Sequence, residues 1–312
     1  MSGPPAAPLR IATRKSQLAL WQAEHVAALL RRAHGGLDIE LVPMVTQGDR
    51  IQDRSLATIG GKGLFIKELE VALEEGRADI AVHSMKDLPG DIPAGLLIAA
   101  VLERADPRDA LLTAAAAGMG DLPRGARVGT SSLRRQAQLL AVRPDLRIQT
   151  LRGNVDTRLR RLDEGDLDAI VLACAGLIRL GLESRITARL DLDVCLPAVA
   201  QGAIGIECRG ADLRTRALVS VLEHPATRHT TDAERAFARR LGGSCQSPIA
   251  AHARLEGERL TLEGLVAEPD GTRLLRDSLS GGSEDAAALG HRLAERILAA
   301  GAGPLLERLR VG

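Results

Sequence analysis

The sequence predicts an α/β protein of three domains, because two patterns of apolar residues follow one another along the chain. Before residue 249, short apolar runs rich in Ile and Val alternate with longer segments of helical period, which is typical of α/β domains. From residue 249 onward, alternating polar and apolar segments indicate a small antiparallel α+β domain. The chain of 312 residues also exceeds the usual size of one hydrophobic core.

The first α/β unit begins with a strand at 9–13 and a helix at 16–32. Ser16 is the expected N-cap of this helix, since its hydroxyl can accept a hydrogen bond from a free backbone N–H of the first turn. The unit continues with a strand at 39–46, a helix at 65–75 and a strand at 79–83.

A second set of elements begins after the Ala-rich stretch 114–118. It comprises a strand at 127–130, a helix at 132–142, a strand at 147–150, a helix at 154–163 and a strand at 168–173. A strand-like run at 203–207 follows, and helical patterns return at 211–222 and 230–240.

The third domain is expected to contain strands at 249–255, 259–267 and 273–279 and a helix at 285–299. Cys245 precedes its first strand, in a turn of Gly and Ser. This lone thiol could be a core residue, a metal ligand, a nucleophile or a point of covalent attachment.

Composition excludes several classes of function. Lys and Arg number 41 against 40 Asp and Glu, so no overall charge favours nucleic acid or an anionic membrane. The N-terminus lacks a secretory signal and no apolar run could cross a bilayer, so we expect a cytoplasmic protein with a short floppy tail. The four cysteines and seven histidines show no ligand spacing, so neither a metal site nor a disulfide framework is expected.

Arginine is concentrated in one segment. Residues 124–161 hold ten arginines and no lysine against two aspartates, a local excess of eight positive charges. For Arg143, Arg147, Arg160 and Arg161, exposed ion pairs are the favoured interpretation. Nucleic acid is disfavoured as the partner, since aromatic stacking usually holds single strands and the chain has one Trp, two Phe and no Tyr.

Two of the arginine clusters stand where a predicted strand leads into a helix. The stretches 129–135 and 151–158 combine hydroxyls, backbone N–H groups and guanidiniums at a helix N-terminus, which favours carboxylate or phosphate binding. The Gly-rich turn at 59–65 is weak evidence for another anion site, because Lys62 is followed by Gly63 and the P-loop pattern fails. We therefore expect a polyanionic ligand.

Lys86 and Asp87 directly follow the strand at 79–83, where α/β sheets place ligand-binding residues. An exposed ion pair is the simple interpretation, but a carboxylate there could also move protons or stabilise a developing cation. Cys245 has no recognisable base beside it, so a cysteine hydrolase is unsupported. Cys174 is expected in the core, and Cys208 is expected to be structural.

Seven stretches together resemble the porphobilinogen deaminase (hydroxymethylbilane synthase) family, in order and over nearly the whole chain. They are IATRKSQLALWQ (11–22), GGKGLF (60–65), HSMKD (83–87), GTSSLRRQ (129–136), LRGN (151–154), LPAVAQG (196–202) and GGSCQ (242–246). Each stretch alone is weak, whereas all seven in register are specific.

The resemblance implies a monomeric transferase of tetrapyrrole and haem biosynthesis. Such an enzyme joins four porphobilinogens head to tail with loss of ammonia and releases linear hydroxymethylbilane. The implied cofactor is a dipyrromethane primer bound covalently through Cys245, and the implied catalytic residue is Asp87. Every porphobilinogen carries an acetate and a propionate, which accounts for the arginines.

The resemblance also assigns binding residues. Cofactor binding falls to Lys86, Thr130, Ser131, Ser132, Arg134, Arg135, Arg152 and Gly153. Substrate binding falls to Arg14, Ser16, Lys62, Phe65, Arg158, Arg179 and Gln201, with Lys62 and Phe65 in a mobile loop over the cleft. Two departures from the family are Ser244, where Gly is common, and Thr58, where some relatives carry lysine.

The implied fold is two similar α/β domains like those of periplasmic binding proteins, plus the small third domain. Domain 1 is expected at 1–102 with 203–220, domain 2 at 106–196 and domain 3 at 224–312. The main rival is a two-lobed anion receptor without chemistry. It explains the arginines, but it does not explain Lys86 and Asp87 together with an isolated cysteine in a third domain.

Overall fold

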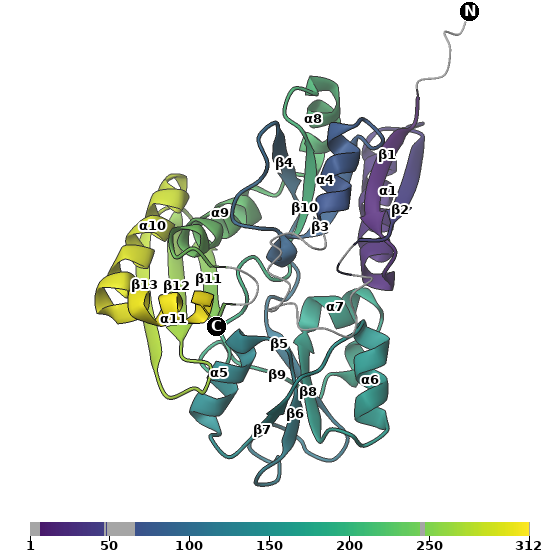
Figure 1. Cartoon of the computed structure of the whole chain (residues 1–312). Helices are drawn as coiled ribbons and strands as arrows, with labels where there is room; N and C mark the ends of the chain where they lie inside the picture. The colour runs from purple at the N-terminus through teal and green to yellow at the C-terminus, as the bar shows by residue number, and fades with distance from the viewer. Residues whose placement is uncertain (1–6, 47, 49–65, 244–246, 312) are drawn as a thin grey trace, which may run out of the picture. The chain divides into compact units, whose positions relative to one another are not determined.

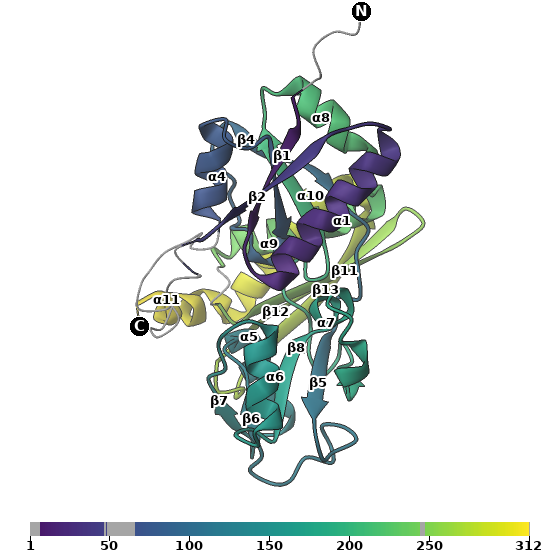
Figure 2. The same cartoon turned by 90° about the vertical axis from the view of Figure 1, so that its right-hand side faces the viewer.

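The computed structural model describes residues 7–46, 48, 66–243 and 247–311. Contacts divide the chain into two compact units (Figures 1 and 2). The first unit is formed by residues 1–104 and 203–227, and the second by 105–202 and 228–312.

The first unit contains a five-stranded sheet of order β2-β1-β3-β10-β4. Its strands are β1 (Leu9–Arg14), β2 (Ile39–Met44), β3 (Ile80–Ser84), β4 (Leu96–Val101) and β10 (Ile204–Arg209). Strand β1 runs parallel to β2 and β3, whereas β10 is antiparallel to β3 and β4. The strand predicted at 203–207 therefore belongs to this sheet, far along the chain from its neighbours.

Helices cover both faces of the first sheet. Helix α1 (Gln17–Ala33) begins at Ser16, whose side chain accepts from Ala19 N, and packs its apolar stripe in the same cluster as Ile80. Helix α4 (Lys67–Glu74) buries Leu69 with Ala81 on the other face, since successive strand residues point to opposite faces. The unit also contains the 3₁₀ turn η1 (Met85–Asp87), helix α8 (Leu213–Val219) and the 3₁₀ turn η3 (Ser220–Leu222).

The second unit begins with a sheet of the same design, of order β7-β6-β8-β5-β9. Its strands are β5 (Asp109–Thr113), β6 (Arg127–Gly129), β7 (Arg147–Gln149), β8 (Ala169–Ala173) and β9 (Ala188–Arg189). Strands β6, β7 and β8 are parallel, and β5 is antiparallel to β8 and β9, as β10 is to its neighbours in the first sheet. Its helices are α5 (Leu133–Val142), α6 (Val155–Asp163) and α7 (Cys174–Arg179), with a 3₁₀ turn η2 (Glu183–Arg185).

The rest of the second unit is built on a three-stranded antiparallel sheet. It contains α9 (Pro225–Arg240) from Arg228 onward, β11 (Ile249–Glu256), β12 (Arg259–Ala267), β13 (Leu274–Gly282), η4 (Ser283–Asp285), α10 (Ala286–Ile297), η5 (Leu298–Ala302) and α11 (Gly303–Val311). Phe237 of α9 and Leu293 of α10 pack against the sheet in one core. Gly264 on β12 makes room for them, because a Cβ there would lie 2.5 Å from the Phe237 ring. We call this part the third domain.

The predicted fold class is confirmed: two α/β sheets of matching order and one small antiparallel sheet with helices. The predicted elements are present, with bounds within a few residues of those expected. Five further elements, β4, β5, β9, α7 and α11, were not predicted. The helix predicted at 230–240 begins earlier, at Pro225, since proline is well suited to a first helical turn. The helix predicted at 211–222 is shorter, because a 3₁₀ turn forms its last part.

Candidate active site

In the first unit, four predicted site residues lie at the carboxyl ends of two neighbouring strands. Arg14 ends β1 and Ser16 caps the helix that follows, while Lys86 and Asp87 follow β3 in η1. Strands β1 and β3 are parallel partners, so their carboxyl ends meet at the same edge of the sheet. This is the edge at which open α/β sheets place ligands.

Met85 anchors the turn that carries Asp87. The Met85 side chain is buried, and its N–H donates to Ala203 O at 3.0 Å. Gly205 on β10 leaves the space for it, because a Cβ there would collide with Met85 Sδ. Lys86 is half-buried and residue Asp87 is exposed, so Asp87 is open to a ligand.

A buried polar pair lies just before this turn. His83 Nε2 on β3 is 2.8 Å from Glu207 Oε2 on β10, and both side chains are almost completely buried. Glu70 on α4 is near the pair, and its pKa is raised, first by burial and then by the charge of Glu207. Gln22 of α1 donates to Ser84 Oγ at 3.1 Å. These contacts fix the end of β3.

In the second unit, the first predicted anion site follows β6. Thr130 Oγ1 accepts from Ser132 N at 3.2 Å, and Ser131 Oγ donates to Leu151 O at 2.6 Å. Ser132 caps α5, accepting from Arg135 N. The three hydroxyl residues thus stabilise a tight turn at a helix N-terminus, with the Ser131 residue exposed.

The second predicted anion site follows β7, which is the parallel neighbour of β6. Gly153 has φ +102° and lies against Thr157, so a side chain at Gly153 would be strained and would meet Thr157 at 2.9 Å. Asn154 caps α6 by accepting from Thr157 N, and Arg158 Nε donates to Gly153 O at 2.9 Å. Arg152 is half-buried at the start of this turn.

Arg134 and Arg135 are buried and bind a carboxylate of the chain itself. Arg134 Nη1 lies 2.7 Å from Asp109 Oδ2, and Arg135 Nη2 lies 2.7 Å from Asp109 Oδ1. Burial alone would raise the pKa of Asp109, but the charges of the two guanidiniums and their hydrogen bonds hold it well below its usual range. Two arginines on one carboxylate leave an excess of positive charge at this site.

The segment before Pro197 closes the other side of this cluster. Leu196 O accepts from Arg134 Nη1 at 2.8 Å and from Gln138 Nε2 at 3.1 Å, while Leu196 N donates to Gln138 Oε1 at 2.7 Å. Cys195 is buried beside Asp109, and burial raises the pKa of its thiol to about 12. Cys195 is therefore a structural thiol.

Arg179 and Gln201 are buried and donate to groups of the second unit. Arg179 Nη2 donates to Gly202 O at 2.6 Å, and burial lowers its pKa to about 10. Gln201 Nε2 donates to Pro107 O at 2.7 Å and to Asp109 Oδ1 at 2.9 Å. Both side chains thus donate to groups of the chain itself, and their contact with substrate stays a prediction.

Three of the predicted site residues, Lys62, Phe65 and Cys245, lie outside the described residues. Among described residues, sequence reasoning missed the roles of Asp109 and Glu207. The available signal was a carboxylate in an apolar run: Asp109 opens β5, and Glu207 lies inside β10. Cys174 is buried, as predicted, and Cys208, which was predicted to be structural, is also buried.

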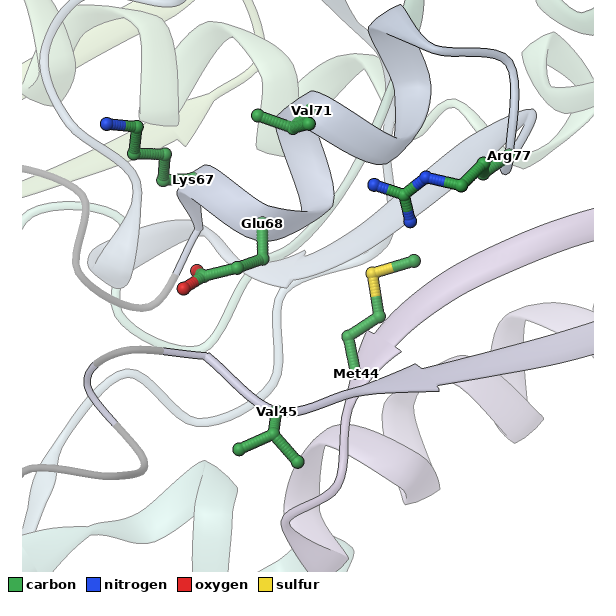
Figure 3. Close-up of a pocket in the computed structure, with 6 residues that line it drawn as sticks. All are labelled: Met44, Val45, Lys67, Glu68, Val71 and Arg77. Atoms are coloured by element: carbon green, nitrogen blue, oxygen red, sulfur yellow. The ribbon is translucent and has the colours of Figure 1, made fainter.

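A pocket of about 530 Å³ lies between the end of β2 and α4. Met44, Lys67 and Arg77 are among its lining residues (Figure 3). It contains none of the predicted site residues. Within the described ranges, no cluster of His, Cys, Asp and Glu could hold a metal ion. No helix in the same part of the chain combines the length and apolar character needed to cross a bilayer.

Two family models match the chain. Residues 9–217 match "Porphobilinogen deaminase, dipyromethane cofactor binding domain", and residues 229–299 match "Porphobilinogen deaminase, C-terminal domain". The chain belongs to the porphobilinogen deaminase family. Membership confirms the predicted family, transferase class, role in tetrapyrrole biosynthesis and dipyrromethane cofactor.

Relatives named porphobilinogen deaminase agree over almost their whole length. The protein of Xanthomonas euvesicatoria pv. vesicatoria is 58% identical over 301 residues, covering 96% of this chain and 99% of the relative. The protein of Xanthomonas axonopodis pv. citri is 57% identical over 301 residues, again covering 96% of this chain and 99% of the relative.

Among solved structures, the periplasmic VFT2 domain of Bordetella pertussis BvgS is 17% identical with a TM-score of 0.42, covering 68% of this chain and 86% of that one. A TRAP periplasmic solute binding protein from Desulfovibrio salexigens is 12% identical with a TM-score of 0.42, covering 69% and 72%.

Proposed function

We propose that this member of the porphobilinogen deaminase family joins four porphobilinogens head to tail, with Asp87 as catalytic residue and Cys245 as the point of primer attachment. The observation that carries the proposal is the exposed Asp87 carboxylate at the carboxyl end of β3, on a turn anchored by buried Met85. A fixed anion stabilises a transition state most where positive charge develops. That charge develops on the substrate methylene as ammonia departs.

The donor groups at the carboxyl ends of the strands fit a dipyrromethane, which carries four carboxylates. The hydroxyls of Thr130, Ser131 and Ser132 and the arginines 134, 135 and 152 would hold it, together with Gly153 and Lys86. When bound, the primer supplies the pyrrole to which the first substrate is joined. Arg14, Ser16, Lys62, Phe65, Arg158, Arg179 and Gln201 are proposed to bind porphobilinogen and the growing chain.

Asp87 acts in each cycle by accepting hydrogen bonds from pyrrole N–H groups and by stabilising the cation left when the amine leaves. Its neighbour Lys86 carries the opposite charge and is proposed to bind a carboxylate rather than to neutralise Asp87. Attachment of the primer at Cys245 requires no base beside the thiol, because the thiol reacts once and is then capped by the primer. We also propose that the protein works as a monomer in the cytoplasm.

The intact mass of the purified protein tests the attachment. We expect an excess equal to two linked pyrrole units on the peptide that contains Cys245, and its loss in Cys245→Ala. An anion receptor or a cysteine hydrolase would carry no such mass. A fully active protein without added mass would disprove the attachment.

Asp87→Asn tests the catalytic role, since it removes the charge and preserves the shape of the side chain. The expected loss in kcat is about a hundredfold or more, because an electrostatic stabiliser of this kind contributes about 3 kcal/mol. Asp91→Asn is the matched control: this carboxylate is also exposed and lies on the same connection. Near-normal turnover of Asp87→Asn, with Asp91→Asn unchanged, would rule out the role.

A further inference from the structure

We propose that the turn between β12 and β13 of the third domain is a positioning element for helix α5, and that Gly271 permits the contact. Through α5 the turn sets the location of Arg134 and Arg135. The inference rests on the role proposed above for these arginines toward the primer carboxylates. The turn and the helix both belong to the second unit.

The turn approaches α5 at backbone distance. Gly271 has φ +75°, and a Cβ on it would lie 2.6 Å from Ala141 N and 2.7 Å from Ala137 O. These are backbone atoms of a helix, so no side-chain rotation could relieve the contact. Ala137 and Ala141 are four residues apart and therefore share one helix face. The turn and this face fit only if residue 271 is glycine.

A hydrogen bond fixes the same contact. Gln136 Nε2 on α5 donates to Pro269 O in the turn, with a distance of 3.0 Å. Inside the turn, Gly271 N donates to Glu268 O at 3.0 Å, which holds its shape. The turn thus contacts α5 both through its backbone and through a specific amide.

An apolar cluster continues the contact toward the sheet. Ala137 of α5 packs with Leu196 and with the third-domain residues Ala250, Leu265 and Ala267, all fully buried. The α5 face is therefore part of a core that it shares with β11 and β12. A displaced turn would have to disturb this core or move the helix.

A second tether reaches the segment that supports the arginines. Arg276 on β13 donates from Nη1 to Asp193 O at 2.9 Å and from Nη2 to Leu192 O at 3.1 Å. This segment leads directly to Leu196, whose carbonyl accepts from Arg134. The third domain thus holds both the helix that carries the arginines and the chain beside it.

Helix α5 also carries the two guanidinium groups that would feel a displacement. Arg134 and Arg135 reach Asp109 at 2.7 Å, a distance that a shift of a few tenths of an ångström would alter. Misplaced guanidiniums would misplace the primer carboxylates and the pyrrole that accepts the next substrate. Catalysis is sensitive to such errors in position.

The test compares Gly271→Ala with Gly257→Ala. Gly257 is the matched control: it lies in the turn between β11 and β12, has φ +60°, and a Cβ on it would meet nothing within 4 Å. Both variants place alanine at a positive-φ position in a hairpin of the same sheet, which strains the backbone. Only the new Cβ of Gly271→Ala would clash with the backbone of α5. The measurements are thermal unfolding, the fraction of molecules with the primer mass, and kcat/KM per primer-bearing molecule.

We expect Gly271→Ala to lower kcat/KM per primer-bearing molecule about tenfold and Gly257→Ala to change it less than about twofold. Normalising to the primer removes any effect of poor folding. If Gly271→Ala does not accumulate, Gln136→Ala loses only the hydrogen bond to Pro269, and we expect about a threefold decrease. The inference would be overturned if kcat/KM per primer-bearing molecule were the same for Gly271→Ala as for Gly257→Ala. If Gln136→Ala is used in place of Gly271→Ala, the same comparison applies.

Failure of this inference differs from failure of the proposed function. If the unchanged protein lacked the primer mass or did not convert porphobilinogen, the proposed function would fail. If the unchanged protein were normal and the Gly271 and Gly257 variants behaved alike, only the positioning role would fail.

Discussion

Asp109→Asn is expected to cost the protein about 4 kcal/mol in free energy of unfolding, because it removes the negative charge that pairs with two buried guanidiniums, those of Arg134 and Arg135. The Asp109 side chain is fully buried and accepts from Arg134 Nη1 at 2.7 Å, from Arg135 Nη2 at 2.7 Å and from Gln201 Nε2 at 2.9 Å. Removing one partner of a buried ion pair typically costs about 3–5 kcal/mol. The amide keeps one acceptor oxygen and nearly the same volume, so the missing charge dominates the loss.

Asp168→Asn is the control for this prediction. Asp168 also pairs with an arginine, Arg127, at 2.9 Å, but both side chains are about one-third exposed or more. Exposed pairs of this kind are worth about 0–1 kcal/mol. Urea unfolding followed by circular dichroism gives both differences, and an Asp109→Asn loss no larger than that of Asp168→Asn would contradict the reasoning.

The pH dependence gives a second check on the same carboxylate. The folded-state pKa of Asp109 is lowered, so its stabilisation is complete above the unfolded pKa of about 3.9 and is lost as the pH falls toward the folded pKa. The gap in stability between the native protein and Asp109→Asn should therefore be constant from pH 7 to about 5 and narrow below about 4. An unchanged gap at pH 3 would show that Asp109 is not held ionised by its arginines.

Two further predictions concern the thiols and Gly202 of the second unit. Burial raises the pKa of Cys174 and Cys195 to about 12 and of Cys208 to about 11, so a thiol reagent at pH 8 should leave all three unreacted in the native protein. After unfolding, the reagent should count three thiols if Cys245 is capped; a count of four would contradict attachment. Gly202→Ala should cost at least about 2 kcal/mol, because φ is +91° and the new Cβ would lie 2.5 Å from Ala105 O. Gly165→Ala, with φ +78° and open space, should cost only about 1 kcal/mol, and equal losses would contradict the steric argument.

Sequence reasoning predicted the elements whose patterns are local. Helices such as α1 and α5 begin at serine caps and end within a residue or two of the expected position. Strand β5 was missed, because its apolar run is short and its first residue, Asp109, is charged. A charge that opens a buried strand is explained only by its partners, which come from α5, 25 and 26 residues away.

In the candidate site, too, features set by local sequence were predicted, whereas contacts between distant residues were not. Motifs at strand ends predicted where Asp87 and Ser132 would stand, since strand ends in α/β sheets are set by the local pattern. The burial of Arg134 and its bond to Asp109 could not be predicted, because ten similar arginines in one segment do not reveal which of them turns inward. The contact of Gly271 with α5 is likewise tertiary, since turn glycines look alike in sequence.

The order of strands in the first sheet has a consequence for the newly made chain. Strand β4 joins its sheet only through β10, which ends at Arg209, whereas β4 itself ends at Val101. At about 5–20 residues per second, the ribosome needs roughly 5 to 20 seconds to make the intervening segment. During that interval the facing edges of β3 and β4 have no partner strand, and such edges invite pairing with other chains. The first unit is therefore expected to need protection from aggregation until β10 has been synthesised.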